Sequence, residues 1–317
     1  MRIRHFCAGL EKWNGMANTA RQFVAEETAA GHDSQLTNDV EVIERTEKID
    51  RVHIHGTWLP VLWKVAKLAK KKGAELIVRP CGNYDPIRIR CGAIKRLRKW
   101  LVGPFEHAML NRADFVQCTC AAEAEWVKAY HPKARIQMTD LKRFFDLNGR
   151  GRYPQRPATD EKRTIAFDGR CGGLGTSRPT ESARPIHLLY LGRRHPLKGV
   201  EYLEKAVSDL DLDLRIVSNA TGEELEKVWE WCDILVLPTL SENFGRVVAE
   251  ALERGKRVVT TDGAPAWEPP QAVESLKFEV GGLRLGYGGK LVYLIGYREG
   301  TDEERVELLK RGLKFEV

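Results

Sequence analysis

The segment Gly192-Arg193-Arg194-His195-Pro196-Leu197-Lys198-Gly199 decides the fold of the second half of this chain. It follows an apolar run at residues 186–191 and precedes a helix-forming stretch, so we expect a strand, a loop and a helix. Arg193 and Lys198 would then lie beside a helix N-terminus, where free N–H groups and the helix dipole favour an anion. The pattern fits a diphosphate site. Taken alone it is weak, because a basic loop is more often simply solvated.

A second loop of the same kind lies some forty residues further on, within the sequence LPTLSENFGRVVAEALERG of residues 237–255. Glu242 falls in the loop after an expected strand, and Glu250 lies two turns inside the helix that follows. A carboxylate at the end of a strand can bind sugar hydroxyls, and one on the next helix can bind a ribose. The apolar neighbours of Glu250 favour a place near a cleft over the alternative, an ordinary surface glutamate.

Strand and helix patterns alternate along both halves of the chain, which predicts an α/β protein with parallel, doubly wound sheets. The strands are expected at residues 3–8, 51–55, 75–79, 114–119, 135–138, 186–191, 214–218, 234–238 and 257–261. The helices are expected at residues 15–30, 59–72, 94–111, 121–130, 199–208, 223–231, 244–254 and 302–311. Two capping boxes support helix starts, Thr221-x-x-Glu224 and Thr301-x-x-Glu304.

A polar stretch rich in Gly, Pro and Arg separates the two halves. We therefore expect an N-terminal Rossmann-like domain at residues 1–147, a linker or long loop at 148–184, and a C-terminal domain at 185–317. Ligands of doubly wound sheets bind at the carboxyl ends of the strands, so the two domains should face each other across a cleft.

The composition is that of a globular protein that stays where it is made. Of the 317 residues, 43% are hydrophobic and 30% charged, which excludes a mainly disordered chain. No apolar stretch approaches the ~20 residues of a transmembrane helix, and the N-terminus lacks the apolar centre of a secretory signal. Seven scattered cysteines form no disulfide framework. We expect a cytoplasmic protein.

Positive charge is concentrated in the first half of the chain. Residues 1–150 contain 26 Lys and Arg against 17 Asp and Glu, a net +9, while the remainder carries −2. Six of these cations lie at residues 88–99, with Arg96, Arg98 and Lys99 next to apolar side chains. This patch could bind an anionic membrane surface or could be a solvated helix face, and charge favours neither. Nucleic-acid binding is the weaker third alternative, because no motif of that kind accompanies the charge.

The two loops of the second half together resemble a known family. The pattern G-R-x-x-x-x-K-G, followed by L-P-T-x-x-E-N-F-G-x-x-x-x-E-A-L-x-x-G, is similar to the donor domain of retaining glycosyltransferases of GT-B fold, family 4. In the first half, residues 9–17 look like the glycine loop of this family. Residues 53–58, His-Ile-His-Gly-Thr-Trp, resemble the H-x-H-G-x-W segment of its lipopolysaccharide-type members. The resemblance implies two Rossmann-like domains facing a cleft.

The resemblance also implies roles for individual residues. Arg193 and Lys198 would hold the nucleotide diphosphate and stabilise it as the leaving group, and Glu250 would bind the ribose. Glu242 would contact the donor sugar. The backbone of Asn243, Phe244 and Gly245 would face the sugar and phosphate, and Gly15 and Met16 would close over the diphosphate from the other domain. No metal and no cofactor is implied, because GT-B enzymes transfer sugars without either.

One segment departs from the family pattern near the expected acceptor. Family members often carry a histidine in a P-H-G segment, where this chain has Pro80-Cys81-Gly82. The role of that histidine is then vacant, unnecessary or taken by His55.

Our leading hypothesis is a metal-independent, retaining glycosyltransferase, peripheral on the inner face of the cell membrane. It would move a sugar from a nucleotide-sugar donor to a glycan or lipid-linked acceptor in cell-surface polysaccharide or lipopolysaccharide synthesis. The alternatives are a catalytically silent GT-B protein that binds a nucleotide or glycan, and a basic nucleic-acid-binding protein, although no nucleic acid is expected.

Overall fold

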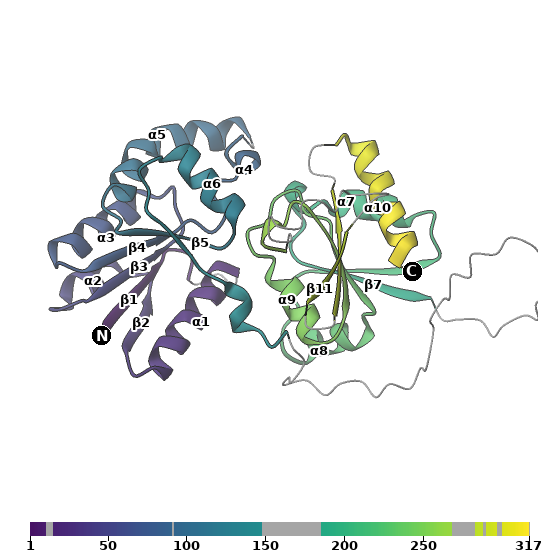
Figure 1. Ribbon diagram of the computed structural model, residues 1–317, viewed down its shortest axis with the longest axis horizontal. Coiled ribbons are helices and arrows are strands. Elements are labelled where there is room, and N and C mark those ends of the chain that lie inside the picture. Colours follow the sequence, from purple (N-terminus) through teal and green to yellow (C-terminus); the bar gives the residue numbers. More distant parts are fainter. Residues whose placement is uncertain are drawn as a thin grey trace, which may run out of the picture.

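The computed structural model describes residues 1–10, 15–90, 92–147, 185–267, 283–287, 290–296 and 300–316. These residues form two six-stranded sheets, each flanked by helices (Figure 1). The α/β class and the parallel sheets expected from the sequence are confirmed. The linker expected at 148–184 lies outside the described residues, so the domain boundaries beside it stay a prediction.

The first sheet is entirely parallel and has the order β2-β1-β3-β4-β5-β6. Its strands are β1 (Arg2–Cys7), β2 (Asp33–Thr37), β3 (Arg51–His55), β4 (Glu75–Arg79), β5 (Phe115–Cys118) and β6 (Ile136–Met138). The helices are α1 (Gly15–Ala29), α2 (Val40–Arg45), α3 (Pro60–Lys71), α4 (Pro86–Arg90), α5 (Ala93–Leu110) and α6 (Ala121–Tyr130), followed by a 3₁₀ turn η1 (Leu141–Phe144). Figure 1 shows α1 on one side of this sheet and α3 and α5 on the other.

The second sheet has the order β11-β12-β10-β9-β7-β8 and is parallel except for β11. Its strands are β7 (Ile186–Leu191), β8 (Leu212–Val217), β9 (Ile234–Leu237), β10 (Arg257–Thr261), β11 (Leu283–Tyr287) and β12 (Lys290–Ile295). Its helices are α7 (Val200–Val207), α8 (Gly222–Trp231), α9 (Arg246–Glu253) and α10 (Asp302–Glu316), with 3₁₀ turns η2 (Pro196–Lys198) and η3 (Pro265–Trp267).

The central strands are buried on both faces, as parallel strands between two layers of helices must be. All four residues of β9 are buried, as are five of the six residues of β1. α3 shows how the helices cover this core. It begins at Pro60, whose missing N–H is not needed there, and it buries Leu62, Val65, Ala66 and Ala69 at helical spacing.

Five helices and strands were not expected from the sequence: β2 with α2, the short helix α4, and β11 with β12. β2 is a polar edge strand, Asp-Ser-Gln-Leu-Thr, which lacks the apolar run that marks a buried strand. β11 breaks the strand–helix alternation by pairing antiparallel with β12.

Of the two expected capping boxes, one forms completely. The Thr301 N–H donates to the Glu304 carboxylate, and the Glu304 N–H donates to the Thr301 hydroxyl. Thr221 precedes α8 as expected, but its side chain makes no capping hydrogen bond.

Gly263 sets how closely two loops of the second sheet approach each other. A Cβ atom there would collide with the Thr239 carbonyl oxygen and lie 2.7 Å from the Leu240 carbonyl carbon. The Gly263 carbonyl also accepts a hydrogen bond from the Glu242 N–H at 2.7 Å. Glycine at this position therefore fixes the loop that carries Glu242.

We expect Gly263→Ala to lower the free energy of unfolding by about 1–3 kcal/mol, because backbone atoms must move to admit the methyl group. Urea unfolding measures this. Gly103→Ala is the control, since its Cβ would lie 3.8 Å from the Tyr130 hydroxyl in the interior of α5 and should stabilise the helix slightly. Equal stabilities of the two variants would contradict this role of Gly263.

Candidate active site

Arg193 and Lys198 lie in the loop between β7 and α7, as expected. The Tyr190 hydroxyl donates to the Arg193 carbonyl at 2.9 Å, which ties the loop to β7, and the Arg193 side chain is exposed. Lys198 ends the 3₁₀ turn η2 and is only 18% exposed. Gly199 follows in a left-handed conformation, with φ of 65°, and begins α7. Of these two cations, Arg193 is therefore exposed and Lys198 is mostly buried.

Lys198 and Glu242 form an ion pair, although 44 residues separate them. They meet because β7 and β9 are neighbours in the parallel sheet, and both loops leave its carboxyl edge. The Asn243 N–H donates to the same carboxylate at 3.1 Å. Burial raises the pKa of Glu242, but the charges of Lys198 and Arg88 outweigh it and hold this pKa below its usual value. Glu242 is therefore a fixed anion beside a fixed cation.

Asn243, Phe244 and Gly245 form the turn into α9. Gly245 adopts φ of 63°, which favours glycine, and its carbonyl accepts the Val248 N–H at 2.8 Å in the first turn. Phe244 is buried, and its carbonyl accepts the Trp267 indole N–H at 2.5 Å. These contacts hold the N-terminus of α9 next to Glu242.

Glu250 lies further along α9 and is engaged by a cation of the same helix. The Arg246 guanidinium lies 3.6 Å from its carboxylate, and the Glu250 side chain is 28% exposed. Burial raises the pKa of Glu250 despite the opposing charges of Arg246 and Arg254. Arg246 also donates to Gln22 on α1 at 2.5 Å, so this part of α9 contacts the first sheet's helices.

Three residues of the first half meet the Glu242 loop, and none was expected there: Arg88 was assigned to the basic patch, and Asp85 and Thr119 belong to no motif. The Ser241 hydroxyl donates to Asp85 at 2.6 Å and accepts from the Arg88 Nε at 2.7 Å. Arg88 also donates to the Ser241 carbonyl at 3.1 Å. The third is Thr119, whose hydroxyl lies 2.8 Å from the Asn243 side-chain amide. Arg88 therefore adds a cation from the first half at Glu242.

The loop after β4 contacts Asn243 directly. A Cβ at Gly82 would lie 2.9 Å from the Asn243 Cβ, so only glycine fits without a shift. The Gly82 N–H donates to Glu123 at 2.6 Å, and the Thr119 N–H donates to the same carboxylate at 2.8 Å. Glu123 is fully buried and thus joins the loops after β4 and β5 where both touch the second half.

Gly15 and Met16 begin α1 and also lie where the halves meet. A Cβ at Gly15 would be 3.5 Å from the Arg246 Cδ, and one at Gly56 would be 3.2 Å from the Met16 sulfur. Residues 11–14 of the expected glycine loop lie outside the described residues. The structure therefore brings Gly15 next to α9, and its role toward a diphosphate stays a prediction.

His55 lies inside the layer under α1, whereas Cys81 directly precedes Gly82, which contacts Asn243. His55 is 1% exposed, and its Nε2 lies 2.9 Å from the Nδ1 of His5 inside the first sheet's helical layer. Its role in substrate binding stays a prediction. Cys81 adopts φ of 56°, and burial raises the pKa of its thiol to about 11. The thiol is protonated at neutral pH and cannot replace a histidine as a base.

Three cations singled out in the basic patch lie on α5, but their surroundings differ. Arg96 and Arg98 are exposed. Lys99 turns toward the protein instead, donates to the Arg88 carbonyl at 3.0 Å and lies 5.2 Å from the Trp58 ring centre. Of these three cations, Arg96 and Arg98 are therefore directed to solvent, and Lys99 contributes to the packing of α5.

The chain also contains a D-x-D pattern, Asp209, Asp211 and Asp213, which in other enzymes can hold a metal. It lies where β8 begins, at the edge of the sheet opposite to the Glu242 loop. Asp209 forms an ion pair with Lys310, and Asp213 lies 4.0 Å from His187. These acidic residues are not part of the candidate active site.

Two family models match the chain, one in each half. Residues 34–139 match the glycosyl transferase 4-like domain, and residues 180–274 match the glycosyl transferases group 1. The chain belongs to the glycosyltransferases that combine a 4-like domain with a group 1 domain. The second model spans Arg193, Lys198, Glu242 and Glu250, so the residues of the candidate site lie in the group 1 domain of this family. No curated protein sequence matches the chain.

Several solved structures share the fold. Sucrose-phosphate synthase from Thermosynechococcus elongatus is 14% identical with a TM-score of 0.65, over 99% of this chain and 90% of that one. WaaG, a glycosyltransferase of lipopolysaccharide biosynthesis, is 13% identical with a TM-score of 0.57 over 99% and 90%. HepE from Anabaena, in complex with UDP and glucose, is 13% identical with a TM-score of 0.56 over 99% and 94%. At these identities the likeness establishes the GT-B fold alone.

The ion pair of Glu242 predicts how stability depends on pH. Because its pKa in the folded chain is below 4.5, the stabilisation is complete above 4.5 and is lost as the pH falls through the folded pKa. We expect the difference in unfolding free energy between the wild type and Glu242→Gln to shrink on acidification below 4.5. Urea unfolding between neutral and acid pH measures it, and a difference that stays constant with pH would refute the ionised pair.

Proposed function

We propose that the chain is a metal-independent, retaining glycosyltransferase. It moves a sugar from a nucleotide-diphosphate sugar to a glycan or lipid-linked acceptor in cell-surface polysaccharide or lipopolysaccharide synthesis. The observation that carries the proposal is the pairing of Lys198 with Glu242 beside the N-terminus of α9, within the group 1 domain. Solved relatives of the same fold support the donor class, because HepE was crystallised with UDP and with UDP-glucose.

The chemistry of the donor explains the site. Breaking a glycosyl–phosphate bond places negative charge on the leaving diphosphate, and cations and N–H groups that are already in position stabilise it. Lys198 and the exposed Arg193 supply the charge in this proposal, and Glu242 holds the Lys198 ammonium in place until the donor binds. Glu242 then contacts the sugar hydroxyls, and Glu250 contacts the ribose.

Retention fits a front-face reaction better than a covalent intermediate. A nucleophilic carboxylate must approach the anomeric carbon with a lone pair free. Glu242, the carboxylate at the end of β9, is instead ion-paired to Lys198 and accepts the Asn243 N–H. In front-face attack the leaving phosphate itself receives the acceptor proton, which needs no further base.

A catalytically silent GT-B protein is the second candidate, and the protonated Cys81 thiol favours it. The two candidates differ in whether a nucleotide sugar is consumed. Donor hydrolysis or transfer in the purified protein supports the enzyme, and nucleotide binding without turnover supports the silent protein.

We further propose that α5 places the protein on an anionic membrane surface that carries the acceptor. Among the described residues, no helix is long and apolar enough to span a membrane. Ile94, Leu97, Leu101 and Phe105 follow one face of α5 at spacings of three and four residues, and each is at least 38% exposed. Trp100, 74% exposed, lies beside this stripe, and Arg96 and Arg98 accompany it. Exposed apolar side chains among cations are typical of helices that lie in a lipid interface.

The donor site is tested by Lys198→Ala and Arg193→Ala. We expect each to lower turnover by about a hundredfold or more, because each removes a charge that stabilises the leaving group. Arg194→Ala is the matched control, since this cation of the same loop is paired with Glu204 at 2.5 Å. Nucleotide release during transfer is the measurement, and full activity of both test variants would refute the site.

Metal independence is tested by adding a chelator to the wild-type assay, which should leave turnover unchanged. Loss of turnover that manganese restores would refute metal independence.

The membrane surface is tested with liposomes. Each cation near an anionic surface contributes about 1 kcal/mol, so Arg96→Gln with Arg98→Gln should weaken binding by roughly thirtyfold at low salt. Leu97→Ser with Trp100→Ser should weaken it further. Lys128→Gln with Lys133→Gln changes the net charge equally on the exposed end of α6 and should have little effect. Undetectable binding of the wild type to anionic vesicles at low salt would overturn the proposal and favour a soluble acceptor.

A further inference from the structure

Three histidines occupy the buried layer between the first sheet and α1. His5 is on β1, and His53 and His55 are on β3. The register pairs His5 with His53, and residues two apart on a strand share a face, so all three rings lie on the side covered by α1. None is more than 2% exposed. Parallel strands usually carry Val, Ile or Leu at such positions, so three imidazoles there need a physical reason.

Hydrogen bonds account for only part of this cluster. The His5 Nε2 lies 2.7 Å from the Glu27 carboxylate, and the His5 Nδ1 lies 2.9 Å from the His55 Nε2. Among the described residues, neither ring nitrogen of His53 nor the Nδ1 of His55 has a hydrogen-bond partner, and all three atoms are buried. A buried polar group without a partner costs about 1–3 kcal/mol. Stabilising the fold is therefore a poor explanation for His53 in particular.

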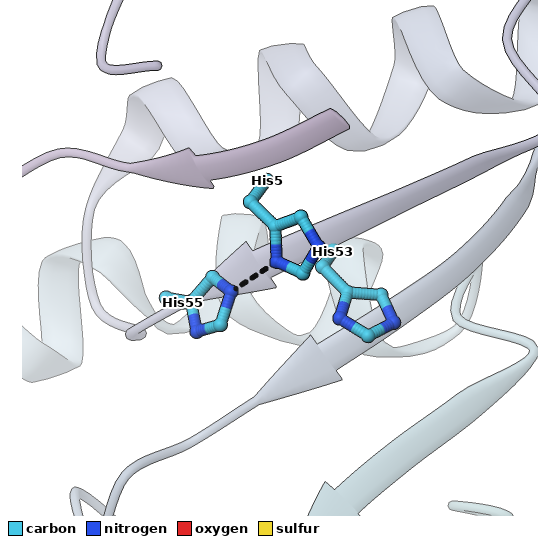
Figure 2. Close-up of side chains that lie close together, drawn as sticks. All are labelled: His5, His53 and His55. Atoms are coloured by element: carbon cyan, nitrogen blue, oxygen red, sulfur yellow. Dashed lines mark hydrogen bonds between the residues drawn. The ribbon is translucent and has the colours of Figure 1, made fainter. Parts of the chain in front are cut away.

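The ring nitrogens converge. One nitrogen from each ring lies within 4.8 Å of those of the other two. Figure 2 shows His5 between the other two rings, with its Nδ1 directed at His55. Nitrogens bound at about 2.0–2.1 Å to one tetrahedral metal lie roughly 3.3 Å apart, so side-chain shifts of about an ångström suffice.

The surroundings of His5 resemble the support of a metal ligand. Ligating histidines almost always give their second nitrogen to a carboxylate or carbonyl, which fixes the ring and its tautomer. The Glu27 carboxylate occupies this place at the His5 Nε2, and the Ser34 hydroxyl holds it with a hydrogen bond of 2.7 Å.

We propose that His5, His53 and His55 bind one divalent transition-metal ion of the class of Zn²⁺ or Co²⁺. Three imidazole ligands leave a fourth position for water or an anion. The His5 Nδ1, the His55 Nε2 and one nitrogen of His53 donate lone pairs. No proton is released where the three rings are neutral, because the proton between His55 and His5 moves to the unpartnered Nδ1 of His55.

Arg79 faces the same layer and opposes a cation. It pairs with His55 in the register of β3 and β4 and is 1% exposed, and its Nε and Nη1 find no hydrogen-bond partner in the part of the chain that the structure describes. Its guanidinium lies 4.7 Å over the Phe23 ring. The positive charge should weaken metal affinity and favour an anion at the fourth position. Arg79→Met should accordingly tighten Co²⁺ binding by about tenfold or more, given the Coulomb energy of charges a few ångströms apart.

Equilibrium dialysis of the full chain against Co²⁺, read by the visible spectrum of four-coordinate cobalt, tests the proposal. We expect one Co²⁺ per wild-type chain, at least tenfold weaker binding by His53→Gln, and unchanged binding by His32→Gln, a histidine outside the cluster. Zn²⁺ should raise the melting temperature of the wild type and of His32→Gln, but not of His53→Gln, because a ligand of the native state stabilises it.

Two results would overturn the proposal: no Co²⁺ bound by the wild type at stoichiometric excess, or equal binding by a folded His53→Gln. If circular dichroism shows that His53→Gln does not fold, X-ray absorption of the cobalt-loaded wild type decides, and fewer than three imidazole ligands overturns it. Binding and melting are measured without donor or acceptor, so the outcome is independent of whether the chain transfers sugars.

Discussion

The ion pair of Lys198 and Glu242 is the interaction on which the candidate site depends. Both charges are largely removed from water, which is costly unless each has a partner in good geometry. The pair exists because β7 and β9 are adjacent and parallel, so two loops 44 residues apart leave the same edge of the sheet. Gly263 then fixes the Glu242 backbone, and Gly245 turns the chain into α9. In the proposed reaction a donor diphosphate would bind the Lys198 ammonium beside the Glu242 carboxylate, which keeps its hydrogen bond from the Asn243 N–H.

The same loop also joins the two halves of the molecule. Ser241 and Asn243 flank Glu242 in sequence, and both contact residues of the first half. Asp85 and Arg88 hold Ser241 from the loop and helix after β4, and Arg88 lowers the pKa of Glu242 through its charge. The electrostatics of Glu242 therefore depend on the position of the first half. Part of the positive charge of the first half acts here, at Glu242, and not at an external surface.

The sequence was sufficient for elements with strong periodicity, and it failed where tertiary pairing decides. The bounds of α6, β7 and β10 were predicted without error, because apolar runs and Pro132 or Gly255 mark them. β2 was missed because a polar edge strand has no such mark. Arg193, Lys198 and Glu242 could be named from their motif, but their pairing needed the strand order. Arg88 and Lys99 were assigned with the basic patch because charge density cannot say which side chains turn inward.

The histidines illustrate the same limit from the other side. The spacing of His53 and His55 predicts from sequence that both side chains lie on one face of a strand, and substrate binding was predicted for His55 alone. Only the register of β1 against β3 adds His5, which is 48 residues away from His53 in the chain. The resulting layer is polar where the opposite face of the same strands packs Phe6, Ile54 and Val78 as an apolar core. The first sheet can tolerate this because its stability comes from the face covered by α3 and α5, which leaves the face under α1 free to carry imidazoles and a buried arginine.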